Sequence, residues 1–423
     1  MTGIAYFALW IFTFAVPWEN IVVIPGVGTI SRLMGMVALG FALLACVVTG
    51  RLRRWRLFHV SALVFVIWSG WGIYQGTILR EDDQAMTSGK FLTYIQLALV
   101  LWMIWELAPS MARLRGLFLA YVLGAYVSAL NTIMLSRSQA ELRRFTAEGF
   151  DPNDLAMTLA LGIPMAWHLG LTAERPVIRW VCKAYLPVAL IALGLTGSRG
   201  GMVAAVVALM IVPLSMTRLT PGRVAGAAVV LVASGAAAIH YVPTTILQRL
   251  RTTTEQVEDG SFNGRMRIWK AGLAALSEKP LIGYGTGGFA RAVRPALKRA
   301  RPAHNAYLSV MVEQGLLGFF LYIAMFALVV RSVLRLPLLQ RRFGLSLMAT
   351  LGVALLPLTW EDRKPVWIIL ALLFGLSEAM AARRAAAEAP VEAYRPAVVR
   401  PRPLRPRERP VSPLRRADGG DPA

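Results

Sequence analysis

Two arginines stand in short glycine-containing segments where they could bind an anion. Arg199 lies in LTGSRGG (195–201), between two apolar runs, and Arg265 lies in NGRMRIWKAG (263–272). Arginine suits phosphate because its planar guanidinium donates two hydrogen bonds at once, and an arginine at membrane depth usually faces a partner or a water-filled cavity. The alternatives are a plain turn whose arginine reaches lipid head groups, and an exposed basic helix on the membrane surface.

The segments that follow Arg265 add charge and an aromatic ring. Trp269 stands four residues after Arg265 and therefore shares a helical face with it, and Arg267 lies between the two. Arg291 and Arg294 belong to a second basic stretch further along the chain. We expect these side chains to be auxiliary contacts to a diphosphate or a glycan.

A histidine marks the point where a charged segment meets an apolar run. His304 and Asn305 stand at the start of the run 305–330, and Tyr307 follows them. The positive end of a helix dipole disfavours a charged imidazole, and a neutral imidazole can accept a proton or a hydrogen bond. These residues predict a role towards a hydroxyl group. The alternative is a polar histidine that caps a helix at the membrane interface.

Acidic and amide side chains precede another apolar run. Asp151 and Asn153 lie in EGFDPNDLAM (148–157), next to the run 153–172. Asp or Asn at such a place typically caps a helix, so we predict a helix start, with a role at the acceptor site as the alternative. A metal site would need more hard ligands than these segments supply, and no metal or other cofactor is expected.

The glycines of PLIGYGTGGF (280–289) spell GxGxxG. A dinucleotide site would require a preceding strand, a following helix and an acidic residue about 20 positions later. This segment is instead followed by arginines and lysines, in a long loop of an apolar chain. We therefore reject the dinucleotide interpretation and expect a flexible loop that borders the site.

The chain that must position these residues is too apolar for a set of soluble domains. Its 423 residues are 56% hydrophobic and 16% charged, with a mean hydropathy of +0.55. We predict an all-α, polytopic membrane helix bundle of about twelve spans, or as few as about ten because two runs are short. The first run predicts a retained span and no cleaved signal peptide. The apolar runs are 4–23, 33–49, 58–75, 91–108, 114–134, 153–172, 183–197, 200–216, 224–241, 305–330, 345–358 and 366–382.

Basic residues in alternate loops indicate the orientation, because Lys and Arg favour cytoplasmic loops. The candidate site residues then lie on the external face of the membrane, with both chain ends in the cytoplasm. The external loop 242–304 carries eleven Lys and Arg against four Asp and Glu, and the spacing in RMRIWKAGLAAL predicts short helices in it. The basic loops are 51–56, 113–115, 174–183, 217–223 and 331–343.

The formal net charge of +22 lies mostly in loops and at the chain end. Residues 383–423 hold ten Arg against five acidic residues and lack an apolar period, which predicts a disordered cytoplasmic tail. This distribution fits a membrane protein, so nucleic-acid binding is rejected. Cys46 and Cys182 lie in or beside apolar runs and are expected to pack there without a disulfide.

Four motifs, taken in order, resemble those of the O-antigen ligase and polymerase superfamily: TGSRGG, GRxxxWxAG, PLIGYGTGGF and AHNAYLxxxxEQGLLG. The strongest likeness covers residues 195–320, and the span pattern with FDPNDLA extends it over 1–382. DPNDLAM also resembles the branch of O-glycosylation ligases found with exosortase systems. The tail 383–423 lies outside the resemblance.

The resemblance implies a membrane-embedded glycosyltransferase fold of the C type, with one ligase domain over residues 1–382. It implies transfer of a glycan from undecaprenyl diphosphate to a hydroxyl of lipid A–core, a polysaccharide or a protein, without a metal and with inversion. Arg199 and Arg265 match the arginines assigned to the diphosphate, and His304 matches the histidine assigned to the acceptor. Direct displacement is the expected mechanism, in which arginines offset the charge on the leaving diphosphate.

Two other functions stay open. A polysaccharide polymerase of the same superfamily would differ in its acceptor, for which the sequence has no readable motif. A transporter or flippase of an anionic solute or a lipid-linked glycan would place its charges near the bilayer midplane, between broken helices. The charges here gather at one face under a long loop, which favours chemistry at a surface.

Overall fold

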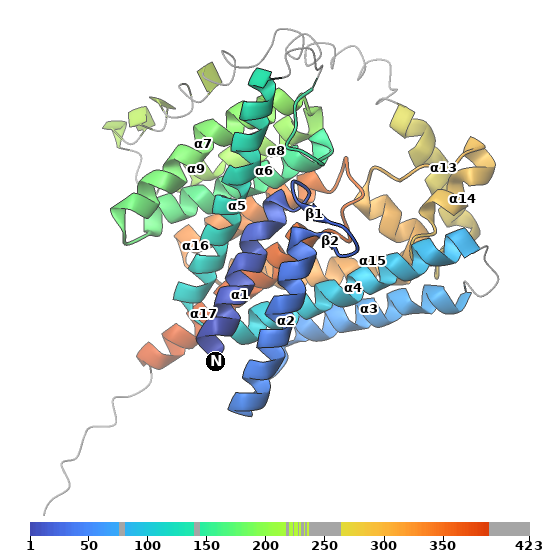
Figure 1. Cartoon of the computed structure of the whole chain (residues 1–423), viewed down its shortest axis with the longest axis horizontal. Helices are drawn as coiled ribbons and strands as arrows, with labels where there is room; N and C mark the ends of the chain where they lie inside the picture. Colours follow the sequence, from blue (N-terminus) through green and yellow to red (C-terminus); the bar gives the residue numbers. More distant parts are fainter. Residues whose placement is uncertain are drawn as a thin grey trace, which may run out of the picture. The chain divides into compact units, whose positions relative to one another are not determined.

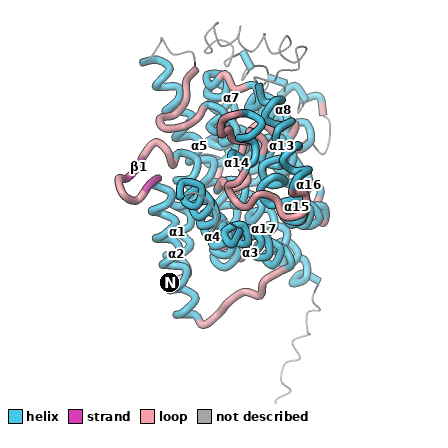
Figure 2. The backbone as a smooth tube through the Cα atoms, turned by 90° about the vertical axis from the view of Figure 1, so that its right-hand side faces the viewer, coloured by secondary structure: helices cyan, strands magenta, loops and turns pink. Residues whose placement is uncertain are grey.

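The protein is almost entirely helical. A computed structural model describes residues 1–75, 81–138, 144–216 and 264–388, together with short pieces between 220 and 236 (Figure 1). Within this part of the chain, the strands are the two-residue β1 (Val23–Ile24) and β2 (Gly28–Thr29), which pair antiparallel in a small hairpin. The all-α prediction is therefore confirmed. Figure 2 shows the hairpin beside α1 and α2.

Helices overlap every predicted apolar run except 224–241, which falls largely outside the described residues. The helices of the first half are α1 (Thr2–Ala15), η1 (Val16–Trp18), α2 (Ile30–Thr49), α3 (Leu57–Gln75), α4 (Glu81–Leu107), α5 (Met111–Ser138), α6 (Pro152–Thr172), α7 (Pro176–Thr196), α8 (Arg199–Leu209) and α9 (Ile211–Leu214). Those of the second half are α13 (Arg265–Glu278), α14 (Phe289–Leu297), α15 (Ala306–Leu334), α16 (Leu338–Ala354) and α17 (Lys364–Glu388).

The chain is a multi-pass membrane protein. Among the described residues, seven helices are long and apolar enough to cross a membrane, and α1 with η1, part of α3, and α8 with α9 are shorter apolar helices. A count of ten to twelve spans stays a prediction. The first residues of the expected disordered tail, 383–388, are instead the end of α17, because alanine, arginine and glutamate favour a helix. The rest of the tail lies outside the described residues.

Three of the predicted basic loops proved to be helical in part or in full. The loop 113–115 lies inside α5, α7 begins at Pro176 within the loop 174–183, and helices occupy most of 331–343. The connection between α15 and α16 consists of residues 335–337. Proline is favoured at the first helical position, and Arg, Lys, Glu and Leu are good helix formers, so charged helix ends resemble loops when spans are read from hydropathy alone.

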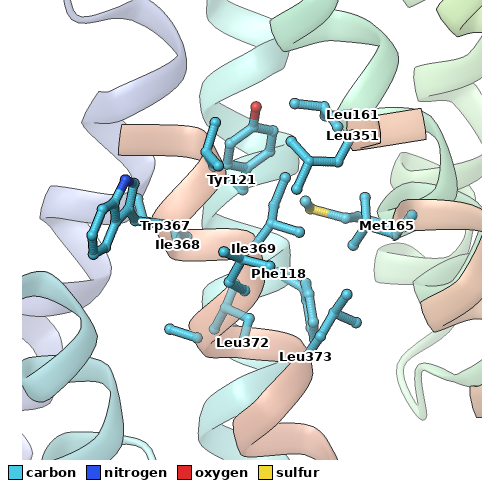
Figure 3. Packing of buried hydrophobic residues seen from close by; sticks show 14 of the residues in the cluster. Phe118, Tyr121, Leu161, Met165, Leu351, Trp367, Ile368, Ile369, Leu372 and Leu373 are labelled. Carbon is cyan, nitrogen blue, oxygen red and sulfur yellow. The ribbon is translucent and has the colours of Figure 1, made fainter. Parts of the chain in front are cut away.

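Helix α17 is central to the main apolar core. Consecutive residues from Val366 to Leu373 are buried, so this helix is covered on every side, as expected of a helix that is apolar all round. Figure 3 shows how it packs: Phe118 and Tyr121 approach from α5, and Leu161 and Met165 from α6. The packed core fixes the positions of the first turns of α6, α8 and α15 relative to one another. Several of the candidate functional residues lie in or next to these turns.

Helix α15 is broken at Gly315. This residue has φ 65° and ψ −176°, so the chain leaves the helix there and starts it again. A Cβ atom at Gly315 would lie 2.2 Å from the Leu281 carbonyl oxygen, which leaves glycine as the residue that fits. Gly315 therefore permits the break. Gly318, farther along α15, packs closely, since its missing Cβ leaves room for Trp68.

The break in α15 lies next to the glycine loop, residues 280–288, and forms backbone hydrogen bonds with it. The N–H groups of Tyr284 and Gly285 donate to the carbonyl oxygens of Val312 and Glu313 at 2.9 and 2.8 Å. The Leu316 N–H donates in return to the Pro280 carbonyl oxygen at 2.7 Å. Helix α13 precedes this loop and α14 follows it, which supports the rejection of a dinucleotide site and confirms short helices in the long loop. Residues 242–263 of that loop lie outside the described part.

Candidate functional site

The turn between α7 and α8 places Arg199 at a helix start. Ser198 caps α8, and its Oγ accepts a hydrogen bond from the Gly201 N–H at 3.2 Å. A Cβ at Gly201 would lie 2.3 Å from Cβ of Ala156, so glycine allows α8 to approach α6 closely. Arg199 is the first residue of α8 and is half-buried. Because Arg199 lies at a closely packed junction between helices, the alternative of a plain turn whose arginine reaches lipid head groups is weaker.

Arg199 and Arg265 line one small pocket. Its volume is about 50 Å³, and three of the side chains at its wall are arginines. They come from three places in the chain: the segment before α6, the start of α8 and the start of α13. The residues that line the pocket are Arg144, Asn153, Gly197, Ser198, Arg199, Gly200, Arg265 and Pro357. Three guanidinium groups around one pocket form a site for an anion with more than one negative charge.

Arg144 is a site residue that sequence reasoning missed. Its Nε donates to the Thr196 carbonyl oxygen at 2.8 Å, and its guanidinium also donates to Asn153 Oδ1 at 3.2 Å. Ser198 Oγ donates to the same amide oxygen at 2.9 Å. Arg144 thus ties the start of α6 to the α7–α8 turn. Arg144 lies in a short loop that was predicted to be external, whereas Lys and Arg favour cytoplasmic loops. This exception is the signal in the sequence that could have identified Arg144 as a site residue.

Arg265 opens α13 and faces the start of α6. It is half-buried, and burial lowers the pKa of its guanidinium while the nearby Asp151 carboxylate raises it. Asp151 caps α6, because its side chain accepts a hydrogen bond from the Asn153 N–H at 2.8 Å. The predicted helix cap is confirmed. The cap also brings a carboxylate within electrostatic reach of Arg265. A role of Asp151 and Asn153 at the acceptor site stays a prediction.

His304 lies in the same electrostatic environment. Burial lowers the pKa of its imidazole below the ordinary value, Arg265 and Arg301 lower it further, and Asp151 raises it. The lowered pKa favours the neutral form of the imidazole. The sequence argument predicted this direction from the helix dipole, whereas the structure assigns it to burial and to neighbouring arginines. The tertiary structure thus brings Arg199, Arg265 and His304 to one end of the helix bundle.

Several predicted contact residues use their polar atoms inside the protein. Trp269 Nε1 donates to the Ala303 carbonyl oxygen at 3.0 Å, directly before His304. Tyr307 donates its hydroxyl to the Gly352 carbonyl oxygen of α16 at 3.0 Å. Both rings therefore hold the segment around His304 in place, and direct substrate contact by them stays a prediction.

Of the remaining residues predicted to contact substrate, two form hydrogen bonds inside the protein and two are exposed. The Asn305 side chain caps α15, where its Oδ1 accepts a hydrogen bond from the Leu308 N–H at 3.0 Å. Arg291 donates to the Tyr284 carbonyl oxygen and so braces the glycine loop. Arg267 and Arg294 are exposed on α13 and α14. They remain candidates for auxiliary contacts to a large glycan.

The connection between α16 and α17, residues 355–363, contributes to the site, although residues up to 358 were predicted to belong to the span 345–358. Pro357 forms part of the pocket wall. Thr359 Oγ1 accepts a hydrogen bond from the His304 N–H at 2.9 Å. Trp360 Nε1 donates to Asp154 Oδ1 at 3.0 Å, and Arg363 pairs with the same carboxylate at 3.5 Å. This segment has no glycine or histidine motif, and its role follows from tertiary contacts alone.

Comparison with known proteins shows which family the chain resembles. A family model described as O-antigen ligase matches residues 184–323, which contain Arg199, Arg265, His304 and the glycine loop. An O-antigen ligase from Pseudomonas aeruginosa is 30% identical over 280 residues, which make up 62% of this chain and 65% of that protein. The match thus spans just under two thirds of the length of that relative. The chain is therefore similar to the O-antigen ligase superfamily over a segment that holds Arg199, Arg265 and His304.

Proposed function

We propose that the protein is a membrane glycosyltransferase that moves a glycan from undecaprenyl diphosphate to an acceptor hydroxyl at the periplasmic face of the inner membrane. One observation carries the proposal: three arginines line a pocket, and a half-buried histidine of lowered pKa shares their environment. The arginines suit the diphosphate of the donor, and the neutral imidazole suits a hydroxyl. The P. aeruginosa relative is named an O-antigen ligase, which supports the same class of reaction.

The arginines act on the leaving group. As the bond between the anomeric carbon and the diphosphate oxygen breaks, negative charge grows on that oxygen. Guanidinium groups that are already in place stabilise this charge without reorganisation, and such preorganised donors are worth about 3–4 kcal/mol each when removed. Arg144 and Arg265 complete the set with Arg199. No metal or other cofactor is required by this scheme.

His304 acts on the acceptor. Its neutral imidazole accepts a hydrogen bond from the attacking hydroxyl and takes the proton as the oxygen bonds to the anomeric carbon. Attack from the face opposite the diphosphate inverts that carbon. Asp151, which raises the pKa of His304, stabilises the imidazolium that forms. The proton then returns to solvent or to the departing diphosphate, and the charges balance.

The site geometry favours a transferase over a transporter. The pocket lies where α6, α8 and α13 begin, at helix ends, and a transport site would be expected between broken helices at mid-membrane. A ligase is favoured over a polymerase because the named relative is a ligase. Lipid A–core, a polysaccharide and a protein hydroxyl are the acceptors to test. The exosortase-associated branch would correspond to a protein acceptor.

The test is a transfer assay in detergent with a glycan on undecaprenyl diphosphate and each acceptor class in turn. His304→Asn is the informative variant, because His304 has φ 48° and asparagine tolerates this backbone conformation. Wild type should consume one acceptor, and the variant should form at least about a hundredfold less product. Equal rates would remove His304 from the mechanism. A protein that transfers to no acceptor but moves lipid-linked glycan across vesicle membranes would overturn the proposal.

A further inference from the structure

A buried ionic cluster lies beside the site and has no role in the scheme above. Lys90 Nζ of α4 contacts Glu313 Oε2 at 2.8 Å and Glu361 Oε1 at 2.6 Å. The Lys90 side chain is 12% exposed, and those of Glu313 and Glu361 are 4% and 0% exposed. One ammonium thus joins two carboxylates out of water, which is costly unless the groups are well paired and hydrogen-bonded.

The remaining contacts of the cluster reach three further segments. Ser309 Oγ of α15 donates to Glu361 Oε1 at 2.6 Å. The Gly287 N–H of the glycine loop donates to Glu313 Oε2 at 3.0 Å. Trp367 Nε1 of α17 donates to the Glu361 carbonyl oxygen at 2.9 Å. The cluster therefore ties together α4, the glycine loop, the first part of α15 and the 355–363 connection.

These tied segments carry His304. Residues 306–314 form a short helical piece between His304 and the break at Gly315, and Glu313 lies at its far end. On the other side, Glu361 lies two residues after Thr359, which accepts the hydrogen bond from the His304 N–H. Lys90 thus fastens both segments that hold the histidine, one on each side. The same connection supplies Pro357 to the wall of the arginine pocket.

We propose that Lys90, Glu313 and Glu361 form a positioning cluster, which holds His304 at a fixed position relative to the arginine pocket. The proposal rests on the proposed function for its kinetic consequence, and its geometric part is independent of it. A short helix piece with a glycine break at one end has little stiffness of its own, so its placement depends on what it is bonded to. Histidine and arginines come from segments far apart, and a shift of about 1 Å between them can cost a hundredfold in rate.

The kinetic test separates positioning from stability. Lys90→Met leaves two buried carboxylates unpaired and should both destabilise the protein and lower kcat. Lys90→Met combined with Glu313→Gln and Glu361→Gln removes every charge of the cluster and should recover thermal stability. We expect this triple variant to keep kcat at least about tenfold below wild type with the donor KM within about twofold, and Lys90→Arg to restore part of kcat. A triple variant with wild-type kcat would show that the cluster merely stabilises the fold and would overturn the proposal.

A second measurement does not depend on activity or on the triple variant. Glu361→Gln keeps the size of the side chain and should remain folded, and the rate of carbethoxylation of His304 by diethyl pyrocarbonate can be read by peptide mass spectrometry. A loosened segment should expose the half-buried imidazole and raise this rate several-fold. An unchanged rate in Glu361→Gln would contradict the proposal, even if wild type transferred no glycan. Arg56→Met, which breaks the Arg56–Glu378 pair at 3.0 Å outside the cluster, is the control and should change neither readout.

Discussion

The backbone N–H of His304 donates to Thr359 Oγ1 at 2.9 Å, across 55 positions of sequence. His304 has φ 48°, a left-handed conformation that is uncommon for residues other than glycine and requires support from its surroundings. A side-chain hydroxyl of the α16–α17 connection gives that support. The histidine is therefore aimed by a residue that no local motif contains.

Thr359→Val should lower kcat by about tenfold and leave the donor KM within about twofold, because it removes the acceptor for the His304 N–H while keeping the side-chain volume. The loss of unfolding free energy should be about 1 kcal/mol, as for a typical hydrogen bond. Transfer kinetics and thermal unfolding in detergent measure both. Thr93→Val is the matched control, since Thr93 donates to the Gly89 carbonyl oxygen within α4. A full kcat in Thr359→Val would show that the histidine is held in another way.

Arg265→Lys should lower kcat/KM by about a hundredfold, because an ammonium keeps the charge but lacks the planar fork that binds two phosphate oxygens. Arg179→Lys is a suitable control, since Arg179 lies on α7 and donates to the Glu174 carbonyl oxygen. Initial rates at varied donor concentration give the comparison. Equal losses in the two variants would point to a general effect of arginine removal on this membrane protein.

Arg144→Gln should raise the donor KM by about tenfold, because Arg144 both lines the pocket and bonds to Thr196 and Asn153. Arg137→Gln, at the exposed last turn of α5, should behave as wild type. Binding of a water-soluble diphosphate analogue, followed by calorimetry, gives the same comparison without catalysis. If both variants bound the analogue equally well, Arg144 would have no part in the anion site.

The pH dependence of kcat/KM should report His304. Its lowered pKa means that the imidazole stays neutral, and active, down to a pH below its ordinary value of about 6.5, and activity should fall as pH drops through the lowered pKa. Asp151→Asn removes a charge that raises this pKa, so the acid limb should move to lower pH. Arg301→Gln removes a charge that lowers it, so the limb should move to higher pH. Rates across about pH 5 to 8 test both variants, and shifts in the same direction would contradict the assignment of the limb to His304.

Gly315→Ala should prevent correct folding or cost more than about 3 kcal/mol, because the new Cβ would meet the Leu281 carbonyl oxygen at a position with positive φ. Gly40→Ala is the control, since nothing lies within 4 Å of a Cβ there and α2 should gain about 0.5–1 kcal/mol. Thermal unfolding of the two purified variants in detergent makes the comparison. A stable Gly315→Ala protein would show that α15 can run unbroken.

Much of the fold could be predicted from the sequence because bilayer spans have a strong local signal. The apolar runs predicted the helices and the all-α class, and the motifs around Arg199, Arg265 and His304 marked the segment that matches the family model. Helix ends were the weak point. Arg179 and Lys183 were assigned to a loop and lie in α7, because charge at the end of a span reads the same whether the backbone is helical or not.

The tertiary structure decided how the site is assembled. Arg144, Thr359, Lys90 and Glu361 carry no motif, and each gains its place through a contact with a residue 52 or more positions away. Other tertiary hydrogen bonds assign Trp269 and Tyr307 to bracing the chain around His304, beside the local helix cap of Asn305. Sequence spacing reports neighbours on one helix, within a turn or two. A site made from helix ends and connections depends on which of them meet, and packing around α17 determines that.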